Sequence, residues 1–200
     1  MSIVTERLIL RQWCESDLEP FAALNADPHV MEFFPHTRTR KQSDETAHRI
    51  VSHIDAHGFG LWALERCDTG EFIGFTGMMH VDFDAGFLPA VEIGWRLAAD
   101  QWGNGFATEA ARACMAYGFE TLQLDEVVSF AVTDNWRSRR VMERIGMHRD
   151  PSRDFDHPDM AAGSPLRRHV FYAIRRAQHR LAQVEPAWID ARPPSRESRS

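Results

Sequence analysis

Residues 91–110 read VEIGWRLAADQWGNGFATEA, and this stretch decides the architecture of the chain. It runs from an apolar segment with the composition of a strand, across a turn, into a segment with the composition of a helix. Small residues alternate in the turn, at Gly103, Gly105 and Ala107. Such a turn indicates either a backbone bend too tight for side chains or a ligand that lies directly against the main chain.

The segment after the turn carries one apolar stripe at helical spacing, made largely of small side chains. Its members are Ala107, Ala110, Ala111, Cys114, Met115, Gly118 and Leu122. Because small side chains let a helix approach a sheet closely, the stripe predicts a helix packed on a β-sheet.

Further strands and helices are predicted on both sides of this unit. Before it we expect a strand at 8–13, helices at 17–26 and 45–57, and a hairpin of strands at 59–67 and 72–81. After it we expect a strand at 126–132, a helix at 136–145, a strand within 147–155 and a last strand at 169–174. This order predicts one α/β domain with a mixed central β-sheet flanked by helices.

Short patterns predict where these helices begin and end. Ser16 and Glu19 have the spacing of a capping box at the start of the first helix. Gly58 and Gly146 predict helix ends, and Asn135 predicts an N-cap. We expect the domain to span residues 1–183, with residues 184–200, rich in Pro, Ser and Arg, as a flexible tail.

Composition excludes several classes of protein. The net charge is −6, and no basic stripe with interleaved aromatic residues occurs, so we expect no nucleic-acid partner. No apolar run approaches the roughly 20 residues that span a bilayer, and we identify no secretion signal. Three widely spaced cysteines suit a reduced compartment, so we expect a cytoplasmic protein without a disulfide framework or membrane partner.

A strand, a glycine turn and a helix start together form an anion site. Backbone N–H groups of the first helical turn lack partners and gain from the helix dipole, so a pyrophosphate suits this place. The alternative is that Gly103 and Gly105 only close a tight turn. A Walker A loop does not fit because its lysine is absent, and Thr108 stands where the dinucleotide fingerprint needs a third glycine.

One continuous unit resembles the acetyl-CoA motif of the GNAT superfamily of N-acetyltransferases: the strand at 91–98, the loop at 102–107 and the helix at 108–119. The pattern of that motif is [QR]-x-x-G-x-[GA]. The segments TERLILRQW (5–13) and NWRSRRVMERIGM (135–147) resemble the branch related to ribosomal-protein N-terminal acetyltransferases. The resemblance covers about residues 3–175. Trp102 departs from the pattern's Gln or Arg, and Met142 stands where many members have a tyrosine general acid.

The resemblance implies an acyl-CoA N-acyltransferase-like fold, a splayed sheet and acetyl-CoA as co-substrate, with no metal. Main-chain groups of Trp95, Arg96 and Leu97 would pair with the pantetheine arm, as in strand addition. The remaining expected contacts to acetyl-CoA are Gly103, Asn104, Gly105, Ala107, Thr108 and Asn135.

Glu92 is the candidate general base. Strand alternation places it on one face with Gly94 and Arg96, opposite the apolar residues. A carboxylate near its usual pKa of about 4.3 suits an α-amine near 8 better than a lysine near 10.4, especially if burial raises the pKa of the carboxyl. Glu92 has two alternative roles, as an ordinary polar residue of a strand face or as a partner of Arg96.

Ser138 is the candidate acid that returns a proton to the departing thiolate, a role that the serine of N-x-x-S takes in the branch that this chain resembles. Asn135 would cap the helix and touch acetyl-CoA or the acceptor. The alternative for both is an ordinary polar helix start.

We therefore predict direct acetyl transfer to a primary amine in a ternary complex, because no cysteine of the motif region is a convincing nucleophile. The favoured acceptor is a protein or peptide N-terminus. The alternatives are a small amine such as an antibiotic or polyamine, a non-catalytic acyl-CoA-binding module and a protein-interaction module. Loops 33–37 and 155–168 are expected to wall the acceptor, and a homodimer through a strand edge or helix face is an open alternative to a monomer.

His53 and His57 stand four residues apart on the second helix, with Asp55 between them. This spacing is compatible with a metal site on one helix face, but the sequence indicates no third ligand. We therefore expect these side chains to be an ordinary solvated face.

Overall fold

The structure is a computed structural model and describes residues 2–83 and 86–179, so the expected tail lies outside the described residues. The first half comprises β1 (Ile3–Val4), β2 (Leu8–Arg11), η1 (Glu15–Asp17), α1 (Leu18–Ala26), α2 (Arg40–His57), β3 (Leu61–Arg66) and β4 (Phe72–His80). The second half comprises β5 (Val91–Leu97), η2 (Ala99–Gln101), α3 (Phe106–Glu120), β6 (Glu126–Val132), α4 (Trp136–Arg144), β7 (His148–Arg149), η3 (Pro151–Arg153), β8 (Phe155–Asp156) and β9 (Arg168–Arg175).

These strands form one mixed sheet in the order β1-β2-β3-β4-β5-β6-β9-β7, with β8 paired to β9. The pairs β2–β3, β3–β4 and β4–β5 are antiparallel, as expected for a meander of short connections. The pair β5–β6 is parallel, because α3 forms the crossover between them. The predicted α/β domain with a mixed sheet is confirmed.

Strands β5 and β6 diverge almost as soon as they meet. Their register contains the single pair Glu92 with Val128, beside which the Ser129 hydroxyl donates a hydrogen bond of 2.9 Å to the Ile93 carbonyl. On its other edge, β5 stays paired with β4 as far as Leu97. The second half of β5 therefore presents one backbone edge that β6 does not cover.

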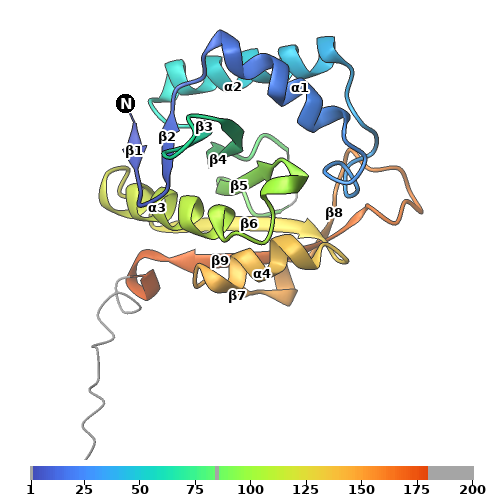
Figure 1. Cartoon of the computed structure of the whole chain (residues 1–200). Coiled ribbons are helices and arrows are strands. Elements are labelled where there is room, and N and C mark those ends of the chain that lie inside the picture. The colour runs from blue at the N-terminus through green and yellow to red at the C-terminus, as the bar shows by residue number, and fades with distance from the viewer. Residues whose placement is uncertain (1, 84–85, 180–200) are drawn as a thin grey trace, which may run out of the picture.

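The sheet is covered on both faces, and each face has its own core. Figure 1 shows α1 and α2 together on one side of β3, β4 and β5, with α3 on the other side. On the α3 side, the buried residues Ala110, Ala111, Cys114 and Met115 form the helix face that the small-residue stripe predicted. On the other side, Phe21 of α1 packs within a smaller cluster. Among the described residues, no helix is both long and apolar enough to cross a membrane.

The first helix begins differently from the prediction. Instead of a capping box at Ser16 and Glu19, the chain forms η1, in which the Asp17 carboxylate accepts the Cys14 N–H at 2.9 Å. Arg11 also holds the buried Asp17, through hydrogen bonds of 2.7 and 2.9 Å. The ion pair with Arg11 therefore fixes Asp17, which in turn organises the start of the helix. Spacing in the sequence does not reveal that Arg11 is its partner.

The other helix ends agree with the sequence more closely. Helix α2 starts at Arg40, five residues before the expected position, because Thr39 and Gln42 form a capping box. It ends at Gly58, as predicted. The expected strand within 147–155 is divided into β7 and β8, with η3 beginning at Pro151 between them, since proline cannot donate to a strand ladder.

Candidate functional site

The glycine turn joins β5, through η2, to the start of α3. Gly103 and Gly105 have φ of +80° and +82°, a left-handed conformation that ordinary side chains disfavour. Gly105 is the N-cap of α3, and no side chain caps this end. The first N–H groups of α3, from Phe106 to Thr108, therefore have no partner within the helix. A Cβ on Gly103 would meet no atom within 4 Å, so protein does not fill the space beside it.

A cavity of about 430 Å³ opens against this turn. Its lining contains eight of the nine residues predicted to contact acetyl-CoA: Trp95, Arg96, Leu97, Gly103, Gly105, Ala107, Thr108 and Asn135. The ninth, Asn104, is absent from the lining. Its side-chain amide donates to the carbonyls of Gln101 and Trp102 at 3.2 and 3.4 Å, and its own carbonyl accepts from Arg7 at 2.9 Å. These bonds favour a role for Asn104 in holding the turn.

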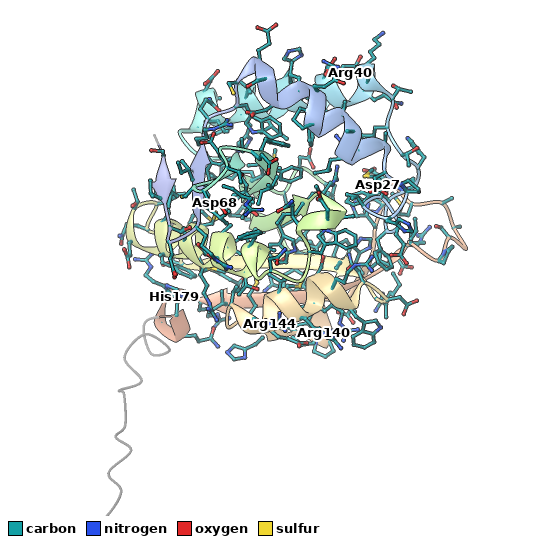
Figure 2. The ribbon with its side chains drawn as sticks, in the orientation of Figure 1. Asp27, Arg40, Asp68, Arg140, Arg144 and His179 are labelled. Carbon is teal, nitrogen blue, oxygen red and sulfur yellow. The ribbon has the colours of Figure 1, made fainter. Side chains whose placement is uncertain are left out.

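Three arginines of α4 also line this first cavity, and the sequence analysis did not identify them. Arg137, Arg140 and Arg144 follow a spacing of three and four residues, so they occupy one helix face. Arg140 and Arg144 are labelled along α4 in Figure 2. The signal was present in WRSRRVMER, but only the fold shows that this face borders the cavity.

Trp102 helps to build the turn. Its indole N–H donates to the Leu97 carbonyl at 2.9 Å, which ties the turn to the end of β5. The Arg137 guanidinium lies over the indole ring, 4.6 Å from its centroid. Trp102 therefore has a structural role at the place where the resembling pattern has Gln or Arg.

The first cavity has the chemistry of a diphosphate site. The start of α3 supplies unpaired N–H groups and the positive end of a helix dipole, and arginine side chains of α4 line the same cavity. The uncovered edge of β5 borders the same space and offers main-chain groups to an amide-bearing chain. These features fit coenzyme A, which combines phosphates with a pantetheine arm.

A second cavity of about 320 Å³ adjoins the first. The residues that line both cavities are Phe33, Phe34, Trp95, Arg96, Asn135 and Ser138. Glu92 and Gly94 line only the second cavity, together with residues of loop 155–168 such as His157 and Met160. The structure therefore brings Glu92 and Ser138 to the walls of one space, next to both predicted acceptor loops.

The surroundings of Glu92 change its acidity. Burial, with a contribution from the negative charge of Asp82, raises the pKa of the Glu92 carboxyl to about 8. Arg96 does not compensate this charge, because its guanidinium donates to Asn25 Oδ1 at 2.6 Å and lies over the Phe34 ring at 4.1 Å. Burial and the nearby Arg38 lower the pKa of Arg96 to about 9.

Asn135 and Ser138 form the N-terminal cap of α4. Asn135 Oδ1 accepts the backbone N–H of Ser138 at 3.1 Å, so the predicted cap is confirmed. The cap uses the backbone of Ser138, and its hydroxyl is not needed for this bond. Met142, one turn further along, is 1% exposed and lines the second cavity with an apolar side chain.

Comparison with known proteins assigns the family. The family model described as an acetyltransferase (GNAT) domain matches residues 7–148. The uncharacterized protein YkkB of Bacillus subtilis is 36% identical over 149 residues, which cover 73% of this chain and 84% of YkkB. The uncharacterized N-acetyltransferase YoaA of the same organism is 29% identical over 153 residues, covering 73% and 82%.

A solved structure shares the whole fold. The GNAT-family acetyltransferase from Bacillus anthracis superposes with a TM-score of 0.73 at 25% identity, covering 88% of this chain and 99% of that one. With the glycine turn, the diverging strands and the family match in agreement, the chain belongs to the GNAT family of N-acetyltransferases, enzymes that use acetyl-CoA as their co-substrate.

Proposed function

We propose that this enzyme transfers an acetyl group from acetyl-CoA to the N-terminal amine of a protein or peptide, by direct attack in a ternary complex. The observation that carries the proposal is the pair of adjoining cavities, which share Ser138 and Asn135 and place Glu92 in the second. Coenzyme A would occupy the first cavity and the amine the second, so the two reactants would meet where β5 leaves β6.

In this reaction the amine nitrogen attacks the thioester carbonyl and the carbon–sulfur bond breaks. Glu92 accepts the proton that the amine loses. The hydroxyl of Ser138 gives a proton to the departing thiolate and takes one back from solvent, so coenzyme A leaves as the free thiol. A carboxyl with a pKa of about 8 matches an α-amine near 8, whereas a lysine amine near 10.4 would rarely be neutral in this range. This match favours an N-terminal amine.

The cysteines support direct attack over a covalent acetyl-enzyme. Cys14 and Cys67 are exposed, and Cys114 is buried on the core-facing side of α3, where burial raises the pKa of its thiol. None of these three described residues lines either cavity. A thiol nucleophile would need to sit beside the thioester as a thiolate.

The charge of the second cavity bears on the alternative acceptors. Among the described residues that line it, Glu92 is the one carboxylate, and Arg96 adds a cation. A polyamine carries several positive charges and would meet a single acidic partner here, so this cavity favours a singly charged amine.

The test measures release of free thiol from acetyl-CoA with a panel of short peptides of free N-terminus, the same peptides with a blocked N-terminus, and small amines that include spermidine. We expect the highest kcat/KM with free peptide N-termini and none with the blocked peptides. Faster turnover of a small amine would replace the proposed acceptor class. Calorimetric binding of acetyl-CoA without turnover of any amine would identify a non-catalytic acyl-CoA-binding module.

A further inference from the structure

Three histidines from two elements come together on the surface, outside both cavities. His53 and His57 lie in the last turns of α2, and His80 is the last residue of β4. Their ring centroids are 4.4 Å apart for His53–His57, 5.0 Å for His57–His80 and 5.8 Å for His53–His80. We call these residues the three-histidine cluster. The fold thus supplies the third imidazole that the sequence did not indicate for the helix pair.

One ring nitrogen of the three-histidine cluster lacks a hydrogen-bond partner. Nε2 of His53 is buried and has no hydrogen-bond partner, a state that costs free energy in a protein interior. Phe59 packs against all three rings, with centroid distances from 5.2 to 6.2 Å, and closes one side of the cluster. The nearby Asp55 accepts a hydrogen bond from Gln12 at 3.2 Å. Within residues 2–83 and 86–179 nothing partners this nitrogen, so its ligand has to come from outside these residues.

The spacing of the nitrogens suits a transition metal. The candidate ligand nitrogens lie within 4.8 Å of one another. A tetrahedral site with Zn–N bonds of about 2.0–2.1 Å requires nitrogens about 3.3 Å apart. His57 and His80 are exposed, so small side-chain rotations of these two rings reach that distance without repacking a core. Two histidines four residues apart on a helix are themselves a recurrent zinc-ligand pair.

The state of His53 is also compatible with a metal. Burial, with the neighbouring His57 and His80, lowers the pKa of His53 below its usual value. Neutral imidazole is the form that ligates metals, and it suits Zn²⁺, Cu²⁺, Ni²⁺ and Co²⁺ rather than Mg²⁺ or Ca²⁺.

We propose that His53, His57 and His80 bind one transition-metal dication of the zinc class, with water as the fourth ligand, and that the ion ties the end of α2 to the end of β4. The three side chains are absent from the lining of both cavities, so the ion would act on structure and not on the acetyl transfer. His80 pairs with Val91, and Met79 with Glu92, in the β4–β5 ladder. The site would therefore steady the end of β4, which pairs with the start of β5 where the candidate base lies.

The test titrates Zn²⁺ into the tag-free, metal-stripped protein by calorimetry. We expect one Zn²⁺ per chain, with binding at least about tenfold weaker in His57→Ala and in His80→Ala. His48→Ala is the matched control, because His48 is exposed on the same helix but lies outside the cluster, and it should bind as the wild type does. Tetrahedral coordination should give an intense visible spectrum when Co²⁺ replaces Zn²⁺.

Thermal unfolding provides a second measurement that does not depend on activity. With Zn²⁺ at about a hundredfold excess over Kd, the Tm of the wild type should rise by about 5–10 °C, and that of His80→Ala by less. The proposal is wrong if the wild type binds no Zn²⁺ at micromolar to submillimolar concentration, or if His80→Ala binds as tightly as the wild type. The second result would place the ion elsewhere, for example at an exposed cysteine.

Discussion

At the scale of single residues, Glu92 combines a strand position with an unusual environment. Its alternation with the apolar residues of β5 directs it into the second cavity, and burial there raises its pKa to about 8. A general base works best when its pKa lies near that of the group it deprotonates.

Replacing Glu92 with Gln should lower kcat/KM about a hundredfold or more, because no carboxylate would then accept the proton of the amine. In the wild type, kcat/KM should rise with pH towards a plateau above about 8, where Glu92 is ionised. The measurements are the pH–rate profiles of the wild type and of Glu92→Gln, together with calorimetric titration of each protein with acetyl-CoA. An unaltered profile, with unaltered affinity for acetyl-CoA, would remove Glu92 from the mechanism.

Asp82 offers a more delicate test of the same residue. Its negative charge helps to raise the pKa of Glu92, so Asp82→Asn should move the midpoint of the pH–rate profile to lower pH. Asp82 is exposed, and the substitution should leave folding intact. A midpoint that stays in place would mean that the titrating group is not Glu92.

Ser138 and Asn135 have separable roles. Ser138→Ala keeps the backbone N–H that Asn135 accepts, so stability should not change. Turnover should fall, because the departing thiolate loses its proton donor. The fall should be limited to about tenfold to a hundredfold, because a thiolate with a pKa near 8.5 leaves with little help from an acid. Asn135→Ala should lower the free energy of unfolding by about 1 kcal/mol through loss of the cap. Full activity in Ser138→Ala would reduce Ser138 to a residue of the helix start.

At the scale of elements, the turn between β5 and α3 combines an unusual backbone conformation with the proposed binding of diphosphate. Its glycines have left-handed backbones, and the N-terminus of α3 is left uncapped by any side chain. The sequence indicated both halves of this arrangement. It did not indicate the arginine face of α4, because the neighbour of a helix face is decided by packing across the sheet.

Two substitutions at Gly105 separate conformational strain from charge. Either alanine or glutamate at φ of +82° should lower the free energy of unfolding by about 1–2 kcal/mol. Gly105→Glu should also abolish calorimetric binding of coenzyme A, because a carboxylate would stand where the phosphates are proposed to bind. Gly105→Ala should retain measurable binding. Equal affinities of the two variants would contradict a diphosphate site at this turn.

At the scale of the whole molecule, burying the ionised Glu92 carboxylate should lower the free energy of unfolding, and this loss should depend on pH. Its pKa is raised on folding, so the folded state binds the proton more tightly than the unfolded state does, and stability is lost as pH rises from about 4.5 to about 8. Glu92→Gln should therefore be stabilised relative to the wild type by an amount that grows across this range, to at most about 5 kcal/mol. Denaturant unfolding at pH values of about 5, 7 and 9 measures this difference between the two proteins. A difference that stays constant with pH would show that Glu92 is not buried as described.

Several features of this molecule were predictable because they depend on neighbours in the chain. The period of the apolar residues in α3, the alternation in β5 and the glycines that end α2 and α4 each follow from local backbone geometry. The capping box predicted at Ser16 and Glu19 was wrong, because Asp17 instead organises the turn before α1 and is bound by Arg11, a contact between separate elements. Local patterns carry no information about such a partner.

By itself, the sequence determined the order of strands and helices, the glycine turn and the family motif, because each depends on residues that lie only a few positions apart in the chain. Only the tertiary structure decided which side chains share a space. The divergence of β5 from β6 joins the cavity of Glu92 to that of the glycine turn, and the end of β4 brings His80 to His53 and His57. The physical reason is that these neighbours come from segments far apart in the chain, which meet only when the sheet and its two helical layers pack together.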